Sequence, residues 1–148
     1  MKKINLRSVR YSPGYCDMRG ESHSVTLAQN KDGSWVMECR DRRMHSSPTV
    51  VVTYEVAPEA VEEFEAFVIR KRVLSLGKRP KSGLFATDYS PWSYSIDCNK
   101  TRFGRTVSDY CRFSEYQKYS GSDRELLKEL NSRLMGLKGN KLSETEEE

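Results

Sequence analysis

The chain has 148 residues, of which 36% are hydrophobic and 31% are charged, and its formal net charge is +4 at pH 7. This length is typical of one domain with one core, and apolar runs such as residues 50–52 fall far short of the ~20 residues that a membrane-spanning helix needs. Residues 1–7 include two lysines but no apolar stretch of the kind found in secretion signals, so we expect a soluble, cytoplasmic protein with no membrane partner.

The first third of the chain predicts strands. Residues 4–11 form the first strand, and alternating apolar residues at 24–28 and 35–40 predict a hairpin around residues 30–33. The Asp-Gly pair in that turn favours the positive φ that tight hairpins need. A further strand at 49–56 places Val50, Val52, Tyr54 and Val56 on one face.

A helix is predicted to begin at Pro58, which suits the first turn because a helix leaves the first N–H groups unpaired. Glutamates follow at its start and the basic run 70–72 stands at its end, which is the polarity that the helix dipole favours. We expect the helix to end between Arg72 and Gly77. Its apolar stripe consists of Val61, Phe64, Phe67 and Val68.

The second half of the chain predicts two strands and a closing helix. The strands cover 92–98 and 105–113, with a turn at 99–104. A capping box with Ser122 as N-cap and Glu125 at the third helical position predicts the start of the helix. Its apolar seam consists of Leu127, Leu130, Leu134 and Leu137, and Gly139 is expected to end it.

Together these elements predict an α+β fold, with an antiparallel sheet of about five to six strands and two helices packed on one face. We expect a single domain over residues 1–140. Residues 141–148 are polar and acidic, and we expect them to form a disordered tail.

Three segments carry a resemblance to a known group: the helix at 59–72, the strand at 92–96, and the second strand that leads to the leucine-rich helix at 125–137. In their order they resemble small bacterial α+β domains of unknown function. That group typically has a short acidic or glycine turn after the strand, whereas this chain has the basic turn Asn99-Lys100-Thr101-Arg102. The resemblance supports the fold and implies no catalytic residues.

The four cysteines, Cys16, Cys39, Cys98 and Cys111, form no C-x-x-C pair and match no zinc spacing. We expect four free thiols, no bound metal and no cofactor. The alternative is a composite zinc site in which cysteines meet His23 or His45 in space.

Those two histidines are the only ones in the chain, and each lies among serines. Two histidines can act as acid and base in the cleavage of RNA, so a small nuclease using His23 and His45 is one hypothesis. The polar surroundings favour surface loops instead. The sequence contains no nucleophile elbow, phosphate-binding loop or H-E-x-x-H motif.

The charge distribution is the most informative feature. Residues 143–148 contain four glutamates, so the rest of the chain carries 25 basic against 17 acidic residues, a net charge of +8. Two basic clusters, at 78–81 and 100–105, flank the strand that bears Trp92 and Tyr94. Cationic loops with interleaved aromatic residues are typical of proteins that bind single-stranded nucleic acid.

The candidate binding surface consists of Lys78, Arg79, Lys81, Trp92, Lys100, Arg102 and Arg105. The alternative is that Trp92 and Tyr94 belong to the core and that the cations only keep the loops hydrated. A single patch requires the two basic loops to converge, and the ends of a six-residue strand are about 20 Å apart. The sequence leaves that geometry open.

The leading functional hypothesis is a non-enzymatic binding protein that acts stoichiometrically on a protein or nucleoprotein partner. The alternatives are direct binding of RNA or DNA through the basic loops, the nuclease, and an inhibitor made by a mobile element, similar in style to anti-CRISPR proteins. The sequence indicates neither the partner nor the oligomeric state.

Overall fold

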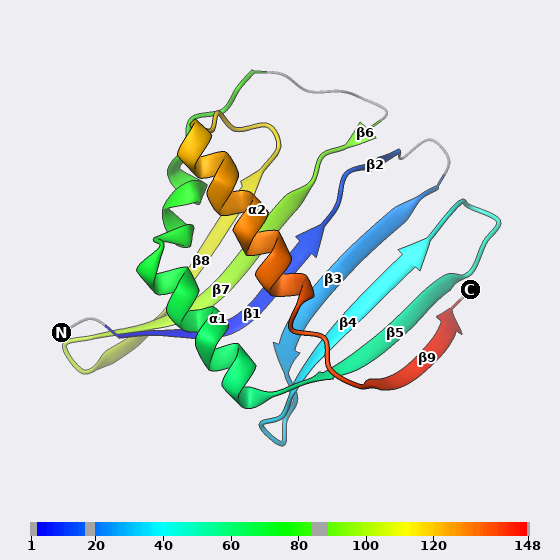
Figure 1. Cartoon of the computed structure of the whole chain (residues 1–148), viewed down its shortest axis with the longest axis horizontal. Helices are drawn as coiled ribbons and strands as arrows, with labels where there is room; N and C mark the ends of the chain where they lie inside the picture. The colour runs from blue at the N-terminus through cyan, green and yellow to red at the C-terminus, as the bar shows by residue number, and fades with distance from the viewer. Residues whose placement is uncertain (1–2, 17–19, 84–88, 148) are drawn as a thin grey trace.

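A computed structural model describes residues 3–16, 20–83 and 89–147 of the chain (Figure 1). Seven antiparallel strands form one sheet in the order β8-β7-β1-β3-β4-β5-β9. The strands are β1 (Lys3–Ser12), β3 (Ser22–Gln29), β4 (Trp35–Arg42), β5 (Thr49–Val56), β7 (Ser93–Arg102), β8 (Arg105–Ser114) and β9 (Lys141–Glu147). β2 (Tyr15–Cys16) and β6 (Tyr89–Ser90) form a separate two-stranded pair. The sheet therefore has more strands than the five or six that the sequence predicted.

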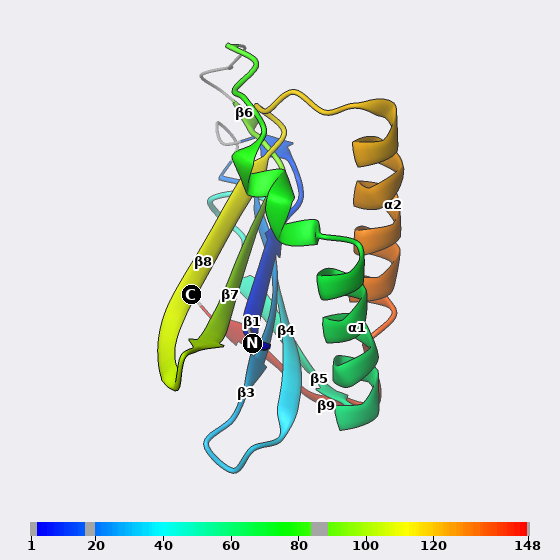
Figure 2. The same cartoon turned by 90° about the vertical axis from the view of Figure 1, so that its left-hand side faces the viewer.

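Both α-helices, α1 (Pro58–Arg70) and α2 (Gly121–Met135), lie on the same face of the sheet (Figure 2). A short 3-10 helix, η2 (Val73–Lys78), follows α1 and packs against β8. The opposite face of the sheet carries no helix among the residues that the structure describes. The α+β class and the antiparallel sheet with helices on one face are confirmed.

The core lies between the helices and the sheet. Four adjacent strands contribute one fully buried row, in which each residue pairs with the next across the sheet: Ile96, Val9, Leu27 and Met37. Phe64 and Phe67 of α1 and Leu130 and Leu134 of α2 belong to the same cluster. The apolar periodicity of each segment thus selects the face that is buried.

The β7–β8 hairpin is longer than the sequence predicted. We expected a turn at 99–104, but β7 continues to Arg102 and only Phe103 and Gly104 make the turn, both with positive φ. The additional β7–β8 pairing beyond residue 98 is stabilised by polar contacts between the strands, including an ion pair of Lys100 with Asp109 on β8.

The boundaries of α2 are also corrected. Ser120 is the N-cap, since its Oγ accepts a hydrogen bond from the Asp123 N–H at 3.1 Å, and the Asp123 carboxylate accepts one from the Ser120 N–H. The predicted box of Ser122 and Glu125 is therefore wrong by two residues. The helix ends at Met135 rather than at Gly139, which instead donates its N–H to the Glu55 carbonyl at 2.8 Å.

The acidic C-terminal segment forms an ordered strand in place of the expected disordered tail. β9 pairs with β5 over residues 141–147, and Arg40 of β4 forms ion pairs with Glu38 and Glu147. Val51, cross-strand from both Arg40 and Thr145, is buried although it points to the helix-free face. The strand pairing and the Arg40 ion pair stabilise β9 where composition alone predicts disorder.

Candidate functional site

The two predicted basic loops lie at opposite ends of the sheet (Figure 1). Lys81 forms an isolated antiparallel bridge with Gln117, just beyond the end of β8. Arg105 is exposed beside the β7–β8 turn, at the other end of that strand. Arg102 closes β7, and its side chain is outside what the structure describes. The seven predicted residues therefore do not form one patch.

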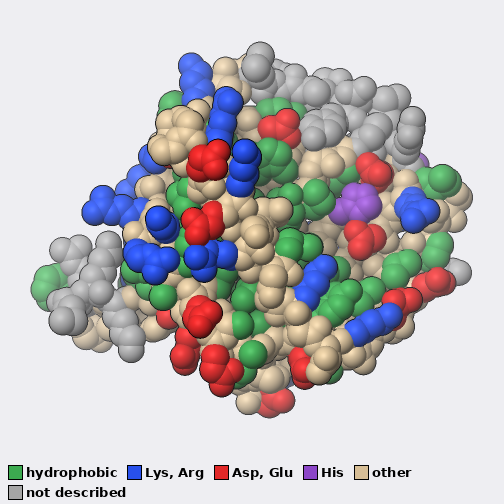
Figure 3. Space-filling view, in the orientation of Figure 1, with side chains coloured by type: hydrophobic (Ala, Val, Ile, Leu, Met, Phe, Trp, Pro, Cys, Tyr) green, Lys and Arg blue, Asp and Glu red, His purple; other side chains and the backbone are tan. Residues whose placement is uncertain are grey.

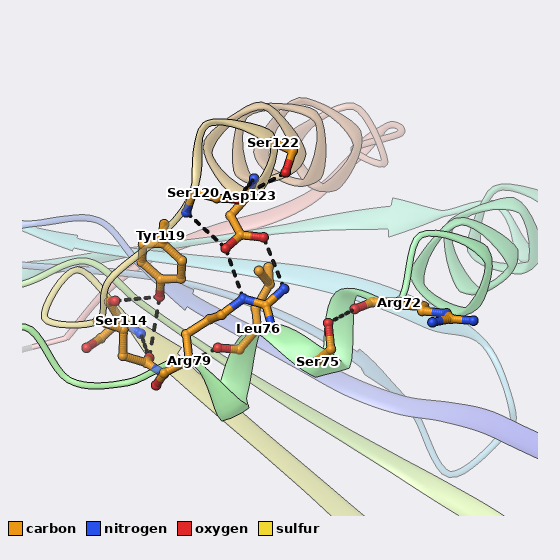
Figure 4. Close-up of polar contacts among 10 residues, drawn as sticks. Arg72, Ser75, Leu76, Arg79, Ser114, Tyr119, Ser120, Ser122 and Asp123 are labelled. Carbon is orange, nitrogen blue, oxygen red and sulfur yellow. Dashed lines mark hydrogen bonds and ion pairs between the residues drawn. The ribbon is translucent and has the colours of Figure 1, made fainter.

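Arg79 is occupied by a structural contact (Figure 4). Its Nε and Nη2 donate to the two carboxylate oxygens of Asp123 at 2.9 and 3.1 Å. These hydrogen bonds lower the pKa of Asp123, whose carboxylate also caps α2. Because its guanidinium is held in this pair, Arg79 joins the end of η2 to the first turn of α2.

Trp92 is partly buried against the core. Its ring stacks on Tyr119 with centroids 5.8 Å apart and meets the edge of Tyr94 at 6.1 Å. Tyr94 itself is buried, and its burial raises its pKa. The aromatic residues beside the basic loops thus act mainly in packing.

Lys78 and Lys100 line the same hollow on the helix-bearing side of β8, although the loops that contain them extend to opposite ends of the sheet. Both line a hollow of about 550 Å³ between η2 and that strand. The two elements approach closely, because a Cβ on Gly77 would lie 2.7 Å from the Cys111 Sγ. Ile4, Val68, Ile69 and Leu74 also line the hollow. It therefore combines an apolar floor with charged walls, in which Asp109 pairs with Lys100 while Arg72 and Lys78 form no ion pair within the described ranges.

Further cations extend this hollow along the end of α1. Arg72 lines it, and its left-handed backbone (φ 54°) turns the chain from α1 into η2. A neighbouring hollow of about 920 Å³ between α1 and α2 is lined by Lys71 and Arg72. We define the cationic rim as Arg70, Lys71, Arg72 and Lys78. Lysine and arginine side chains gather over this part of the molecule in Figure 3.

The cations of the rim are uncompensated. None of the four forms an ion pair with any residue of the ranges described. The acidic side chains that α2 presents to the neighbouring hollow already have partners: Asp123 pairs with Arg79, Glu125 with Lys128, and Glu129 with Arg133. The run 70–72 was visible in the sequence, but its proximity to Lys78 depends on the η2 turn.

His23 and His45, the pair of the nuclease hypothesis, have different neighbours in the structure. Nδ1 of His23 lies 2.7 Å from Asp41 Oδ1, and its Nε2 lies 3.5 Å from Glu21 Oε2. His45 is exposed in the β4–β5 loop, where its ring stands against Gly20. This geometry supports a structural role for His23.

Three cysteines, Cys39, Cys98 and Cys111, are buried free thiols. The Cys111 thiol donates to the Leu74 carbonyl at 3.1 Å, and burial raises its pKa. Burial raises the pKa of Cys98 to about 11. The side chain of Cys16 is outside the described set. Within that set no three metal-binding side chains come together.

No helix in the described ranges is long and apolar enough to cross a membrane. The chain matches no protein-family model, no curated protein and no solved structure. Its candidate surfaces therefore rest on geometry and charge alone.

Proposed function

We propose that the chain is a stoichiometric binding protein that acts on a protein or nucleoprotein partner, with the cationic rim as its contact surface. The observation that carries the proposal is that Lys71, Arg72 and Lys78 line two hollows that share Arg72, next to Arg70 in the last turn of α1, and that none of the four forms an ion pair within the described ranges. Charges of this kind accelerate association with an oppositely charged surface and select against partners of the same sign.

The hollow behind the rim favours a protein contact over a bare phosphate chain. Its lining includes Leu74, which is half-buried, and Ile69, which is 43% exposed. Exposed apolar area beside uncompensated charge suits an acidic protein segment that carries an apolar anchor. Asp109, which also lines this hollow, is already paired with Lys100. An acidic partner would therefore meet little repulsion.

The test is capture of the partner from the cells that make the protein, using the wild type, Arg72→Glu/Lys78→Glu, and a matched control. Lys31→Glu/Arg124→Glu is the control, because it makes the same charge change on the exposed β3–β4 turn and on α2. Thermal unfolding first establishes that the three proteins are equally folded. We expect a one-to-one complex with the wild type and with the control, and about tenfold slower association or more with the rim variant at low salt. Equal capture by all three proteins would contradict the proposal.

The second measurement is cleavage of nucleic acid by the purified protein. We expect purified protein to leave single-stranded RNA and DNA intact over hours. Cleavage that disappears in His45→Ala would overturn the proposal in favour of the nuclease.

A further inference from the structure

The helix-free face of the sheet carries a second cationic surface, independent of the rim. Arg10 of β1 and Arg112 of β8 both stand in register with Ser95 of β7, which lies between them. Neighbouring strands are about 4.8 Å apart, so the two arginine positions are separated by about 10 Å. A small serine between them leaves room for a ligand.

These residues line a shallow hollow of about 560 Å³. Its other walls are mostly hydroxyl side chains, and the full lining is Ser8, Arg10, Ser12, Thr26, Ser93, Ser95, Asp97, Tyr110 and Arg112. Hydroxyls donate and accept hydrogen bonds without a fixed charge. These hydroxyls can bind phosphate and sugar oxygens, although Ser12 already donates to the His23 carbonyl and Ser95 accepts from Tyr110.

Tyr110 provides an aromatic platform. Its hydroxyl donates to Ser95 Oγ on the neighbouring strand at 3.0 Å, so the ring lies along the sheet instead of standing away from it. The residue is nonetheless 60% exposed. An exposed ring anchored in this way can stack with a nucleobase, and such stacking tolerates any base.

The electrostatics favour an anionic ligand. Neither Arg10 nor Arg112 has an ion-pair partner within the described chain. Asp97 is the one acidic side chain in the lining. It stands cross-strand from Tyr110 and Ser8, where a carboxylate can accept from the amino group of a stacked base.

The hollow continues beyond the arginines. Ser12, Ser93 and Arg112 also line a cavity of about 800 Å³ at the end of β8, and Lys81 and Tyr116 belong to that cavity. Cationic and aromatic side chains therefore follow one continuous track from Arg10 to Lys81. A track of this kind fits an extended single strand better than a compact ligand.

We propose that this track, formed by Arg10, Tyr110, Arg112 and Lys81, binds a single strand of nucleic acid. Arg10 and Arg112 hold phosphates, Tyr110 stacks with a base, and the serine hydroxyls bind the sugar and phosphate oxygens. Arg10, Tyr110 and Arg112 lie on the face opposite to α1 and α2, so this proposal can be tested independently of the cationic rim.

The experiment measures binding of a fluorescein-labelled 12-nucleotide RNA of mixed sequence by fluorescence anisotropy, over a range of salt concentrations. Arg10→Glu/Arg112→Glu should weaken binding at least tenfold, and the slope of log K against log salt should fall by about 1.4, because each phosphate contact on a single strand contributes about 0.7. Arg72→Glu/Lys78→Glu is the charge-matched control on the other face and should stay within about threefold of the wild type. Unchanged affinity in the Arg10/Arg112 variant, or an equal loss in both variants, would overturn the proposal.

Two further comparisons test the role of Tyr110 and the preference for a single strand. Tyr110→Leu should lose about fivefold or more in affinity, whereas Tyr110→Phe should bind like the wild type, since stacking needs the ring and not the hydroxyl. A 12-base-pair duplex of the same sequence should bind more weakly than the single strand, and equal binding would contradict the single-strand assignment. Loss of RNA binding with partner capture intact, or the reverse, separates this proposal from that of the rim.

Discussion

The guanidinium of Arg79 donates hydrogen bonds to both carboxylate oxygens of Asp123, a residue 44 positions later in the sequence. The same carboxylate accepts a hydrogen bond from the N–H of Ser120 and so caps α2. One buried side chain therefore fixes both the start of the last helix and its attachment to η2. Two consequences can be measured.

The first is stability. Asp123→Ala removes the ion pair and half of the capping box, and we expect a loss of about 1–2 kcal/mol in the free energy of unfolding by urea. Arg79→Met should cost less, because its side chain is 36% exposed. The two losses should not add in the double variant, since both remove one interaction. If the two losses in unfolding free energy add, the ion pair contributes nothing to stability. Arg124→Met, at an exposed position of α2, serves as the control.

The second is the dependence of stability on pH. The Arg79 hydrogen bonds keep the pKa of Asp123 below its ordinary value, so the folded protein releases this proton more readily than the unfolded chain. The resulting stabilisation is fully present above the ordinary pKa of about 3.9 and is lost as the pH falls through the folded-state pKa. Asp123→Asn should therefore show a flatter decline in unfolding free energy below about pH 4 than the wild type. Parallel curves for the two proteins would refute the assignment.

The centre of the core gives a third prediction. Ile96 is fully buried and pairs across the sheet with Val9 and Cys111. Ile96→Ala should lower the free energy of unfolding by about 2–5 kcal/mol, as for other large-to-small core substitutions. Ser8→Ala, on the helix-free face, should change it by less than about 0.5 kcal/mol. A change of that small size at Ile96 would mean that the strand register is wrong.

The fourth prediction concerns thiol reactivity. Burial raises the pKa of Cys98 to about 11, and it raises those of Cys39 and Cys111 as well. Because the thiolate is the reactive form, these three thiols should resist iodoacetamide in the native protein at pH 8. All four cysteines should react after unfolding in urea, as counted by mass spectrometry. Rapid native labelling of Cys98 would contradict its burial.

Local patterns were sufficient for the elements that bury one regular face. The alternation around Asn30–Gly33 predicted the β3–β4 hairpin, and the stripe from Val61 to Val68 predicted the buried face of α1. The predicted strand at 49–56 coincides with β5. In each case the apolar period and the turn chemistry indicate the same structure.

The remaining features depend on contacts between distant segments. β9 is acidic and fully exposed, and its order comes from pairing with β5 and from the Arg40–Glu147 ion pair, neither of which composition can reveal. The cap at Ser120 was missed because Ser122 and Glu125 fit the same motif two residues later.

The candidate binding surfaces also depend on contacts between segments that are distant in the sequence. The sequence contained the cations, but only the fold decides which of them are paired. Arg79 forms an ion pair with Asp123, whereas Arg72 and Lys78 line one hollow and form no ion pair in the described ranges. The register of β1, β7 and β8 likewise brings Arg10 and Arg112 together from positions about a hundred residues apart.

The central claim, that a partner contacts the cationic rim, is tested most directly by lysine footprinting of the captured complex. The protein is acetylated briefly, alone and in the complex, and the rate at each lysine is followed by mass spectrometry. Lys71 and Lys78 are exposed in the free protein, as is Lys31 on the β3–β4 turn. We expect binding to slow acetylation of Lys71 and Lys78 several-fold and to leave the rate at Lys31 unchanged. Unchanged rates at Lys71 and Lys78, with protection at Lys31 instead, would contradict the claim.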